Sequence, residues 1–331
     1  MRRREFIAFL GGSAALAAWP LVAHAQQSER MRRIGALLAI AEDDPERDVR
    51  VAAFEQGLQQ SGWTIGDNLR IDYLWATNDV ERSQYAAELI SLKPDVLFAS
   101  SGAVVGALQQ ATRTVPIVFV TVIDPVGGGW VSSLARPGGN ATGFASHDFS
   151  LAGKWLELLK EIAPHVTRVA VIRDPSVPAG SGGFAAIQTV APSLGIELTP
   201  IGVRDASEIE LGITDFARSP NGGLIMVGPS SSVALHRDLI IRLAAKHRLP
   251  AVYGSRRFIA IGGLIAYAAD PVDQYRRAAG YIDRILKGEK PADLPVQAPT
   301  KYQLIINLKT AKALGLDLPP SVVARADEVI E

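Results

Sequence analysis

The chain has 331 residues, with 34 Lys and Arg against 34 Asp and Glu, a formal net charge of zero, and no cysteine. A neutral balance without a basic cluster gives no electrostatic footprint for nucleic acid, so we expect no nucleic-acid partner. The absence of cysteine excludes a disulfide framework and a thiol nucleophile. The fold must therefore depend on a hydrophobic core, and the length suffices for two domains.

Residues 1–25 contain the three parts of an export signal. The pair Arg3-Arg4 is followed by a weakly apolar stretch over residues 7–22, and Ala23-His24-Ala25 then offers a small-x-small cleavage site. The stretch is too short and too glycine-broken to span a bilayer, which needs roughly 20 apolar residues. We expect a cleaved twin-arginine signal peptide and a periplasmic mature chain that is not anchored in the membrane, because no cysteine follows for lipidation.

The first half of the remaining chain alternates buried-strand patterns with amphipathic helical patterns. Strands are expected over residues 34–40, 69–75, 95–99, 116–120 and 141–145, and helices over 47–60, 81–92 and 103–113. This order is typical of a mostly parallel sheet with helices on both faces.

The pattern begins again in the second half. Helices are expected over residues 151–162, 185–194, 208–218, 235–247, 272–286 and 310–314, and strands over 168–172, 196–203, 223–227, 251–253, 264–268 and 302–306. The run Gly180-Ser181-Gly182-Gly183 is interpreted as a flexible turn rather than a dinucleotide loop, since two prolines separate it from its strand. Two α/β lobes are favoured over one large doubly wound domain, because residues 145–150 interrupt the alternation.

The usual catalytic and metal-binding patterns are missing. The sequence has no Gly-x-Ser-x-Gly elbow, no Gly-Lys-Ser/Thr phosphate loop and no His-Glu-x-x-His pair. The four histidines after the signal, His147, His165, His236 and His247, do not stand at metal-ligand spacing from one another. We expect a protein that is not an enzyme and that has no catalytic residues, no metal and no cofactor.

Polar residues at expected strand ends are the candidate ligand contacts, because ligands of open α/β sheets bind beyond the carboxyl ends of the strands. Ser100 and Ser101 open a helix and could hold a carboxylate, although helix capping is the alternative for a serine there. Asp124 could meet an ammonium group, or cap a helix that begins at Pro125. The other candidates are Ser146, Asp174 and Ser230 at strand ends, with Tyr253 and Tyr267, whose rings could stack on a ligand or pack in the core.

Several longer strings carry a resemblance through nearly the whole chain after the signal. They are Asp124-Pro125-Val126 and residues 133–143, 154–161, 249–253, 262–264, 283–288 and 307–312. With these strings the chain resembles the substrate-binding proteins of ABC transporters, in the family that includes tryptophan- and tyrosine-binding members. The resemblance implies a type I periplasmic-binding-protein fold, with two Rossmann-like lobes of parallel sheet and flanking helices joined by a three-segment hinge.

On that fold we expect lobe 1 over residues 32–146 plus about 270–300 and lobe 2 over 147–269. The lobe of the C-terminal return, residues 301–331, stays open, as does whether the acidic residues 42–44 line the cleft. The resemblance implies a monomeric receptor that captures an amino acid or a related small carboxylate or aromatic compound between its lobes. The partner would be an ABC permease of the inner membrane; the alternatives are a ligand sensor acting on a kinase or chemoreceptor, and an exported enzyme.

Overall fold

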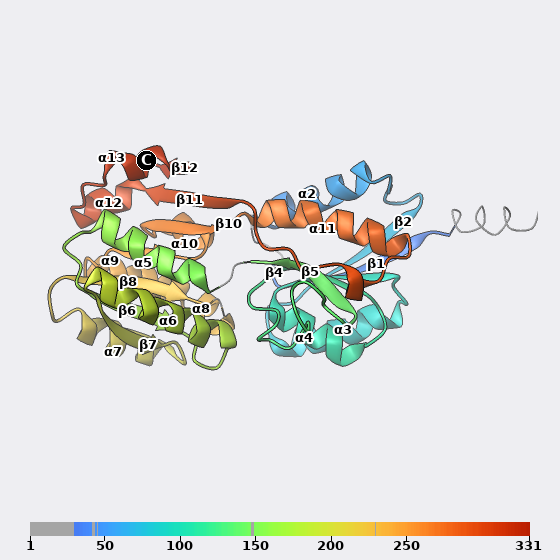
Figure 1. The fold of residues 1–331 in the computed structure, drawn as a ribbon, viewed down its shortest axis with the longest axis horizontal. Helices are drawn as coiled ribbons and strands as arrows, with labels where there is room; N and C mark the ends of the chain where they lie inside the picture. Colours follow the sequence, from blue (N-terminus) through green and yellow to red (C-terminus); the bar gives the residue numbers. More distant parts are fainter. Residues whose placement is uncertain (1–29, 42–43, 45, 147–148, 229) are drawn as a thin grey trace, which may run out of the picture.

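The computed structural model describes residues 30–41, 44, 46–146, 149–228 and 230–331. The expected signal peptide, residues 1–25, lies outside the described residues. The described chain forms two α/β lobes, each built on its own sheet, which lie side by side along the long axis of the molecule (Figure 1).

The first lobe is built on a fully parallel sheet of order β2-β1-β3-β4-β5. Its strands are buried apolar runs, as expected where helices cover both faces of a parallel sheet. The strands are β1 Arg32–Leu38, β2 Leu69–Trp75, β3 Val96–Ser100, β4 Ile117–Val122 and β5 Ala141–Ala145, and the helices between them are α2 Glu46–Gln60, α3 Asp79–Ser91 and α4 Gly102–Ala111.

The second lobe is built on a sheet of order β12-β11-β10-β9-β8-β6-β7. All of its strand pairs are parallel except β10 with β11. The strands are β6 Arg168–Arg173, β7 Glu197–Gly202, β8 Gly222–Val227, β9 Ala251–Tyr253, β10 Ile265–Ala269, β11 Tyr302–Asn307 and β12 Glu328–Ile330. The helical segments are α5 Ser150–Ile162, α6 Pro178–Val190, η2 Ala191–Leu194, α7 Ala206–Phe216, α8 Ser231–Leu235, α9 Arg237–Lys246, α10 Arg256–Ala260, α12 Leu308–Leu314 and α13 Pro320–Ala324.

The chain passes between the lobes after β5, after β10 and again before β11. Helix α11, Pro271–Leu286, returns to the first lobe and lies along α2, although more than 200 residues separate the two (Figure 1). Its buried Gln274 side chain accepts a hydrogen bond from the Thr121 backbone N–H at 2.8 Å and donates one to the Ala145 carbonyl at 3.3 Å. Asp270 caps the same helix at the crossing, and its backbone N–H donates to the Lys301 carbonyl. The C-terminal strands β11 and β12 complete the sheet of the second lobe.

Several details of the second lobe and one of the first differ from expectation. The glycine run at residues 180–183 is helical, inside α6, and the turn interpretation was wrong. The expected helix over 235–247 is interrupted at His236, and α10, α13 and β12 were not anticipated. In the first lobe no helix begins at Pro125, where residues 125–129 form turns instead.

Close packing explains the glycine run. A Cβ atom on Gly180 would lie 2.1 Å from the Asp174 carbonyl oxygen, and one on Gly183 would lie 3.1 Å from the Val227 side chain. Glycine lets α6 approach the ends of β6 and β8 that closely, which outweighs its low helix propensity.

Candidate functional site

Each sheet has one point where the strand order reverses. In the first lobe this point lies between β1 and β3, and in the second it lies between β6 and β8. Ligands of open α/β sheets bind beyond the carboxyl ends of the strands at such points. The residues that follow these strands therefore define the candidate site.

In the first lobe Ser100 joins the two strands at the reversal. Its buried Oγ accepts a hydrogen bond of 2.8 Å from the Ala39 backbone N–H, which follows β1. Ser101 is the N-cap of α4 and accepts from the Val104 N–H at 3.5 Å, with a backbone φ of 84°. Both hydroxyls thus have structural partners, and the capping alternative for Ser101 is present in the structure.

The backbone is strained in the last residues of β4 and just beyond it, at the same edge of the sheet. Thr121 has a φ of 55° and Asp124 a φ of 44°, in the left-handed region that non-glycine residues seldom adopt. The Asp124 Oδ1 accepts a hydrogen bond from the Gly127 N–H at 2.8 Å, so this carboxylate caps a turn and not a helix. Ser146 follows β5 and donates its backbone N–H to the Val122 carbonyl at 2.7 Å. Strain of this kind concentrates at functional sites, where the surrounding structure holds it in place.

In the second lobe the structure brings Asp174 and Ser230 together at the reversal between β6 and β8. Asp174 is only 8% exposed, and its Oδ1 accepts hydrogen bonds from the Ser176 N–H at 3.0 Å and the Ser176 hydroxyl at 2.5 Å. Burial opposes ionisation of this carboxyl, but the hydrogen bonds from Ser176 and the Ser230 hydroxyl outweigh it and hold the pKa of Asp174 below its ordinary value. Ser230 also caps α8 by accepting from the Val233 N–H at 3.2 Å.

The two candidate tyrosines lie in the body of the second lobe. Tyr253 is 2% exposed and stacks on Phe258 with 4.9 Å between ring centroids, and burial raises its pKa well above the ordinary value. The ring belongs to the hydrophobic core, as the core-packing alternative proposed, and it does not project from the strand end. Tyr267 is partly buried and stacks on Tyr302 at 5.5 Å, while its backbone carbonyl accepts a hydrogen bond from the Trp155 indole N–H.

A charged cluster between the lobes escaped the sequence analysis. In the first lobe Asp44 and Glu46 stand at the start of α2, and Asp44 Oδ1 accepts from the Glu46 N–H. From the second lobe Arg257 Nη2 approaches Asp44 Oδ2 to 2.8 Å, and its Nε lies 3.6 Å from Glu46 Oε2. The neighbouring Arg256 Nε lies 3.9 Å from Glu46 Oε1. Asp44 of the acidic loop therefore faces the second lobe.

Arg50 of α2 completes this cluster from the first lobe. It forms an ion pair with Glu46 one helical turn earlier. It also lies against the buried Tyr275 hydroxyl of α11, which contacts Ser100 as well. Burial raises the pKa of Tyr275, while Arg50, Ser100 and Arg257 act in the opposite direction. The charged cluster is thereby connected to the strand reversal of the first lobe.

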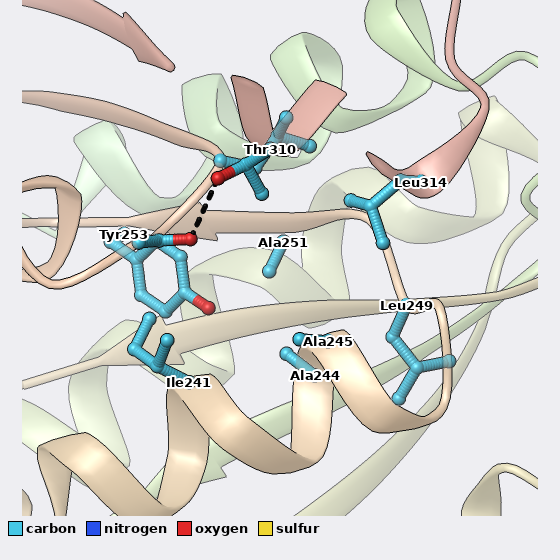
Figure 2. A pocket seen from close by; sticks show the side chains of 10 residues that line it. Ile241, Ala244, Ala245, Leu249, Ala251, Tyr253, Thr310 and Leu314 are labelled. Carbon is cyan, nitrogen blue, oxygen red and sulfur yellow. Dashed lines mark hydrogen bonds between the residues drawn. The ribbon is translucent and has the colours of Figure 1, made fainter. Parts of the chain in front are cut away.

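A small hollow behind Tyr253 is not part of this site. Figure 2 shows that it is lined by α9, the neighbouring strand β9 and α12, with Ile241, Ala244, Leu249 and Leu314 around it. The Thr310 hydroxyl beside it donates a hydrogen bond to the Gly262 carbonyl at 2.9 Å. Its volume of about 10 Å³ is that of a single water and cannot hold an amino acid.

The described part of the chain holds no group of three or more His, Cys, Asp or Glu residues arranged as metal ligands. Within the same described ranges, no helix has both the length and the apolar character needed to cross a bilayer.

Three known proteins are similar to this chain over most of its length. The chain is 26% identical over 290 residues to the tyrosine-binding protein of Clostridioides difficile, covering 87% of this chain and 82% of that one. Its structure matches a conserved domain protein from Vibrio cholerae with a TM-score of 0.81 at 27% identity, over 91% of this chain and 100% of that one. It has the same fold as the ABC domain from Streptococcus pneumoniae in complex with L-Trp, with a TM-score of 0.81 at 23% identity over 90% and 99% of the chains.

The family comparison extends over almost the same residues. The model of the ABC transporter substrate binding protein family matches residues 36–330, which includes all three passages between the lobes and both sheets apart from the first residues of β1. Members of this family are substrate-binding proteins rather than enzymes. The fold expected from the resemblance is confirmed by the two lobes and by these relatives, and the chain belongs to the ABC transporter substrate binding protein family.

Proposed function

We propose that this protein is a periplasmic receptor that binds an amino acid or a related small aromatic carboxylate between its lobes and delivers it to an ABC importer. The observation that carries the proposal is the family match over residues 36–330, joined to a strand reversal in each sheet where polar residues follow the strands. The tyrosine-binding relative favours an aromatic amino acid as the ligand class.

The proposal also includes the export pathway, the oligomeric state and the ligand contacts of the protein. The arginine pair at residues 3–4 supports export by the twin-arginine pathway with cleavage after Ala25, and the mature chain acts as a monomer. The proposed ligand contacts are the polar residues that follow the strands, namely Ser100, Ser101, Asp124, Ser146, Asp174 and Ser230. Tyr253 is left out because its ring lies in the core, whereas the partly buried Tyr267 remains a proposed contact.

A thermal-shift screen tests the binding function. A ligand at 100 times its Kd stabilises the folded protein by about 2.7 kcal/mol. For a chain of this length that corresponds to a rise in Tm of about 4 °C. We expect such a rise with L-tryptophan, L-tyrosine or a related aromatic carboxylate. A broad library of amino acids, carboxylates and nucleosides without any shift would contradict the proposal.

Hinge closure has its own test. Gln59 of α2 and Gln188 of α6 are exposed and belong to different lobes, so spin labels at these positions report the distance between the lobes. A ligand held by both lobes should narrow the distance distribution. An unchanged distribution at saturating ligand would contradict closure.

A further inference from the structure

Three guanidinium nitrogens between the lobes are buried without a hydrogen-bond acceptor among the described residues, which leave out residues 42, 43 and 45. They are Nε of Arg50, from the first lobe, and Nε and Nη2 of Arg257, from the second. Nη2 of Arg257 is close enough to Asp44 for an ion pair, but the direction of its N–H groups does not give a hydrogen bond. Leaving a buried donor unpaired destabilises the folded protein, and more so when the donor belongs to a charged group. An arrangement with three such donors is stable only if something else satisfies them.

The protein carboxylates nearby are already shared. Glu46 stands against three guanidinium groups, those of Arg50, Arg256 and Arg257. Asp44 is divided between the Glu46 backbone N–H and Arg257. Burial, followed by the charge of Arg50, lowers the pKa of Arg257 despite both carboxylates, and Arg237 acts in the same direction. The cluster therefore has room for one more negative charge.

The position of the cluster is that of a ligand site. Arg50 lies against the Tyr275 hydroxyl, and Tyr275 in turn contacts Ser100 at the reversal between β1 and β3. Arg257 is the second residue of α10, the short helix that follows the carboxyl end of β9. Because Arg50 and Arg257 belong to different lobes, opening the hinge would expose both and closing it would bring both onto one bound group.

We propose that Arg50 and Arg257 form an anion subsite that binds a carboxylate of the ligand as the lobes close. Nε and Nη2 form one edge of the Arg257 guanidinium, and two parallel N–H donors on such an edge match the two oxygens of a carboxylate. Arg50 Nε adds a donor from the opposite lobe. The subsite rests on the proposed function, and it assigns the carboxylate to arginines rather than to Ser100 and Ser101.

Substitution of Arg257, combined with a change in the ligand, tests the subsite. Isothermal titration would compare L-tyrosine with L-tyrosinamide and L-tryptophan with L-tryptophanamide, which lack the carboxylate charge. We expect Arg257→Gln to weaken binding of the two acids about ten- to a hundredfold, the range for a lost charge-assisted hydrogen bond. The amides should bind the unchanged protein weakly, and Arg257→Gln should not weaken them further.

Arg256→Gln is the matched control. Arg256 adjoins Arg257 on the same helix and also approaches Glu46, but both of its Nη atoms pair with Glu328. We expect acid binding within roughly twofold of the unchanged protein, because a surface ion pair contributes little. Arg257→Lys keeps the charge and loses the paired edge, so it should lie between the unchanged protein and Arg257→Gln. Arg257→Lys can also replace Arg257→Gln in the titration if the Gln variant is unfolded at the temperature of the experiment.

The outcomes separate the subsite from the proposed function. Equal acid binding by the Arg256→Gln and Arg257→Gln variants would overturn the subsite and leave the receptor function intact. An equal loss of acids and amides in Arg257→Gln would show that Arg257 only fastens the lobes together through Asp44, which also overturns the subsite. If none of the four compounds binds and the library screen gives no shift, the receptor function fails and the subsite with it.

Discussion

The two strand reversals occupy equivalent places in their sheets but differ in how their polar groups are arranged. In the first lobe the groups are spread along the edge, and each is held by its own strand or turn: Ser100 by Ala39, Ser101 by Val104 and Asp124 by Gly127. In the second lobe Asp174, Ser176 and Ser230 form one compact group around a single carboxylate.

The backbone conformations at the two sheet edges also differ. The first edge places non-glycine residues at positive φ, at Ser101, Thr121 and Asp124. The second uses glycine, at Gly228 with a φ of 70° and at Gly180 where α6 meets the strands. A strained edge held by separate local bonds can adjust residue by residue, whereas a close-packed edge changes as a unit. We infer that the second lobe gives the more rigid half of the site.

The largest expected loss of stability comes from adding a Cβ atom at the close contact between Gly180 and Asp174 in the second lobe. Gly180→Ala would place a Cβ 2.1 Å from the Asp174 carbonyl oxygen, which is backbone and cannot turn away. We expect a loss of about 3 kcal/mol in the free energy of unfolding, measured by urea denaturation.

Gly102→Ala is the counterpart in the first lobe. Its Cβ would meet the Trp130 ring at 2.0 Å, and a partly buried side chain can shift. We expect a loss of about 1 kcal/mol. Equal losses in the two variants would contradict the difference in rigidity between the edges.

The next effect in size concerns the carboxylate of the second lobe. Asp174→Ala leaves the donors of Ser176 without their acceptor, so we expect a loss of about 2 kcal/mol at pH 7. Because the folded pKa of Asp174 is lowered, its contribution is complete above the unfolded pKa of about 3.9 and disappears as the pH falls through the lower folded pKa.

Unfolding by urea at pH 7 and pH 3 measures that dependence. The stability difference between the unchanged protein and Asp174→Ala should be smaller at pH 3. A difference that is the same at both pH values would mean that the ionised carboxylate adds nothing beyond its packing.

Most of the fold could be predicted from the sequence, because most strands are local apolar runs and most of the longer helices are local amphipathic patterns. Strands 69–75, 141–145 and 251–253 have the predicted bounds, and α2 begins one residue early. The helical glycine run could not be predicted, because its helix depends on packing against β6 and β8. Pairing of β10 with β11 in opposite directions is likewise set by the crossing of the chain, which local patterns do not record.

The candidate site was predictable only in part. The sequence placed Asp174 and Ser230 at strand ends, and the structure brings the two side chains together because parallel strands end at one edge of the sheet. The pairing of Arg257 with Asp44 joins positions more than 200 residues apart, so no spacing indicates it. For Tyr253 a signal was present: Ala251 and Tyr253 share one face of a three-residue strand, and a strand that short between helices is buried on both faces.

The smallest expected effects distinguish the two serine caps. Ser230 accepts from Val233 at 3.2 Å and also contacts Asp174, so Ser230→Ala should cost about 1 kcal/mol. Its effect should be non-additive with Asp174→Ala, because the two side chains interact.

Ser101 accepts only at 3.5 Å and its φ of 84° suits glycine, so Ser101→Ala should cost about 0.5 kcal/mol and Ser101→Gly less. Urea denaturation measures all of these, and ligand titration of the same variants separates capping from binding. If Ser101→Ala leaves stability within that range but weakens ligand binding about tenfold, the hydroxyl contacts the ligand; if stability and affinity are both nearly unchanged, Ser101 only caps α4.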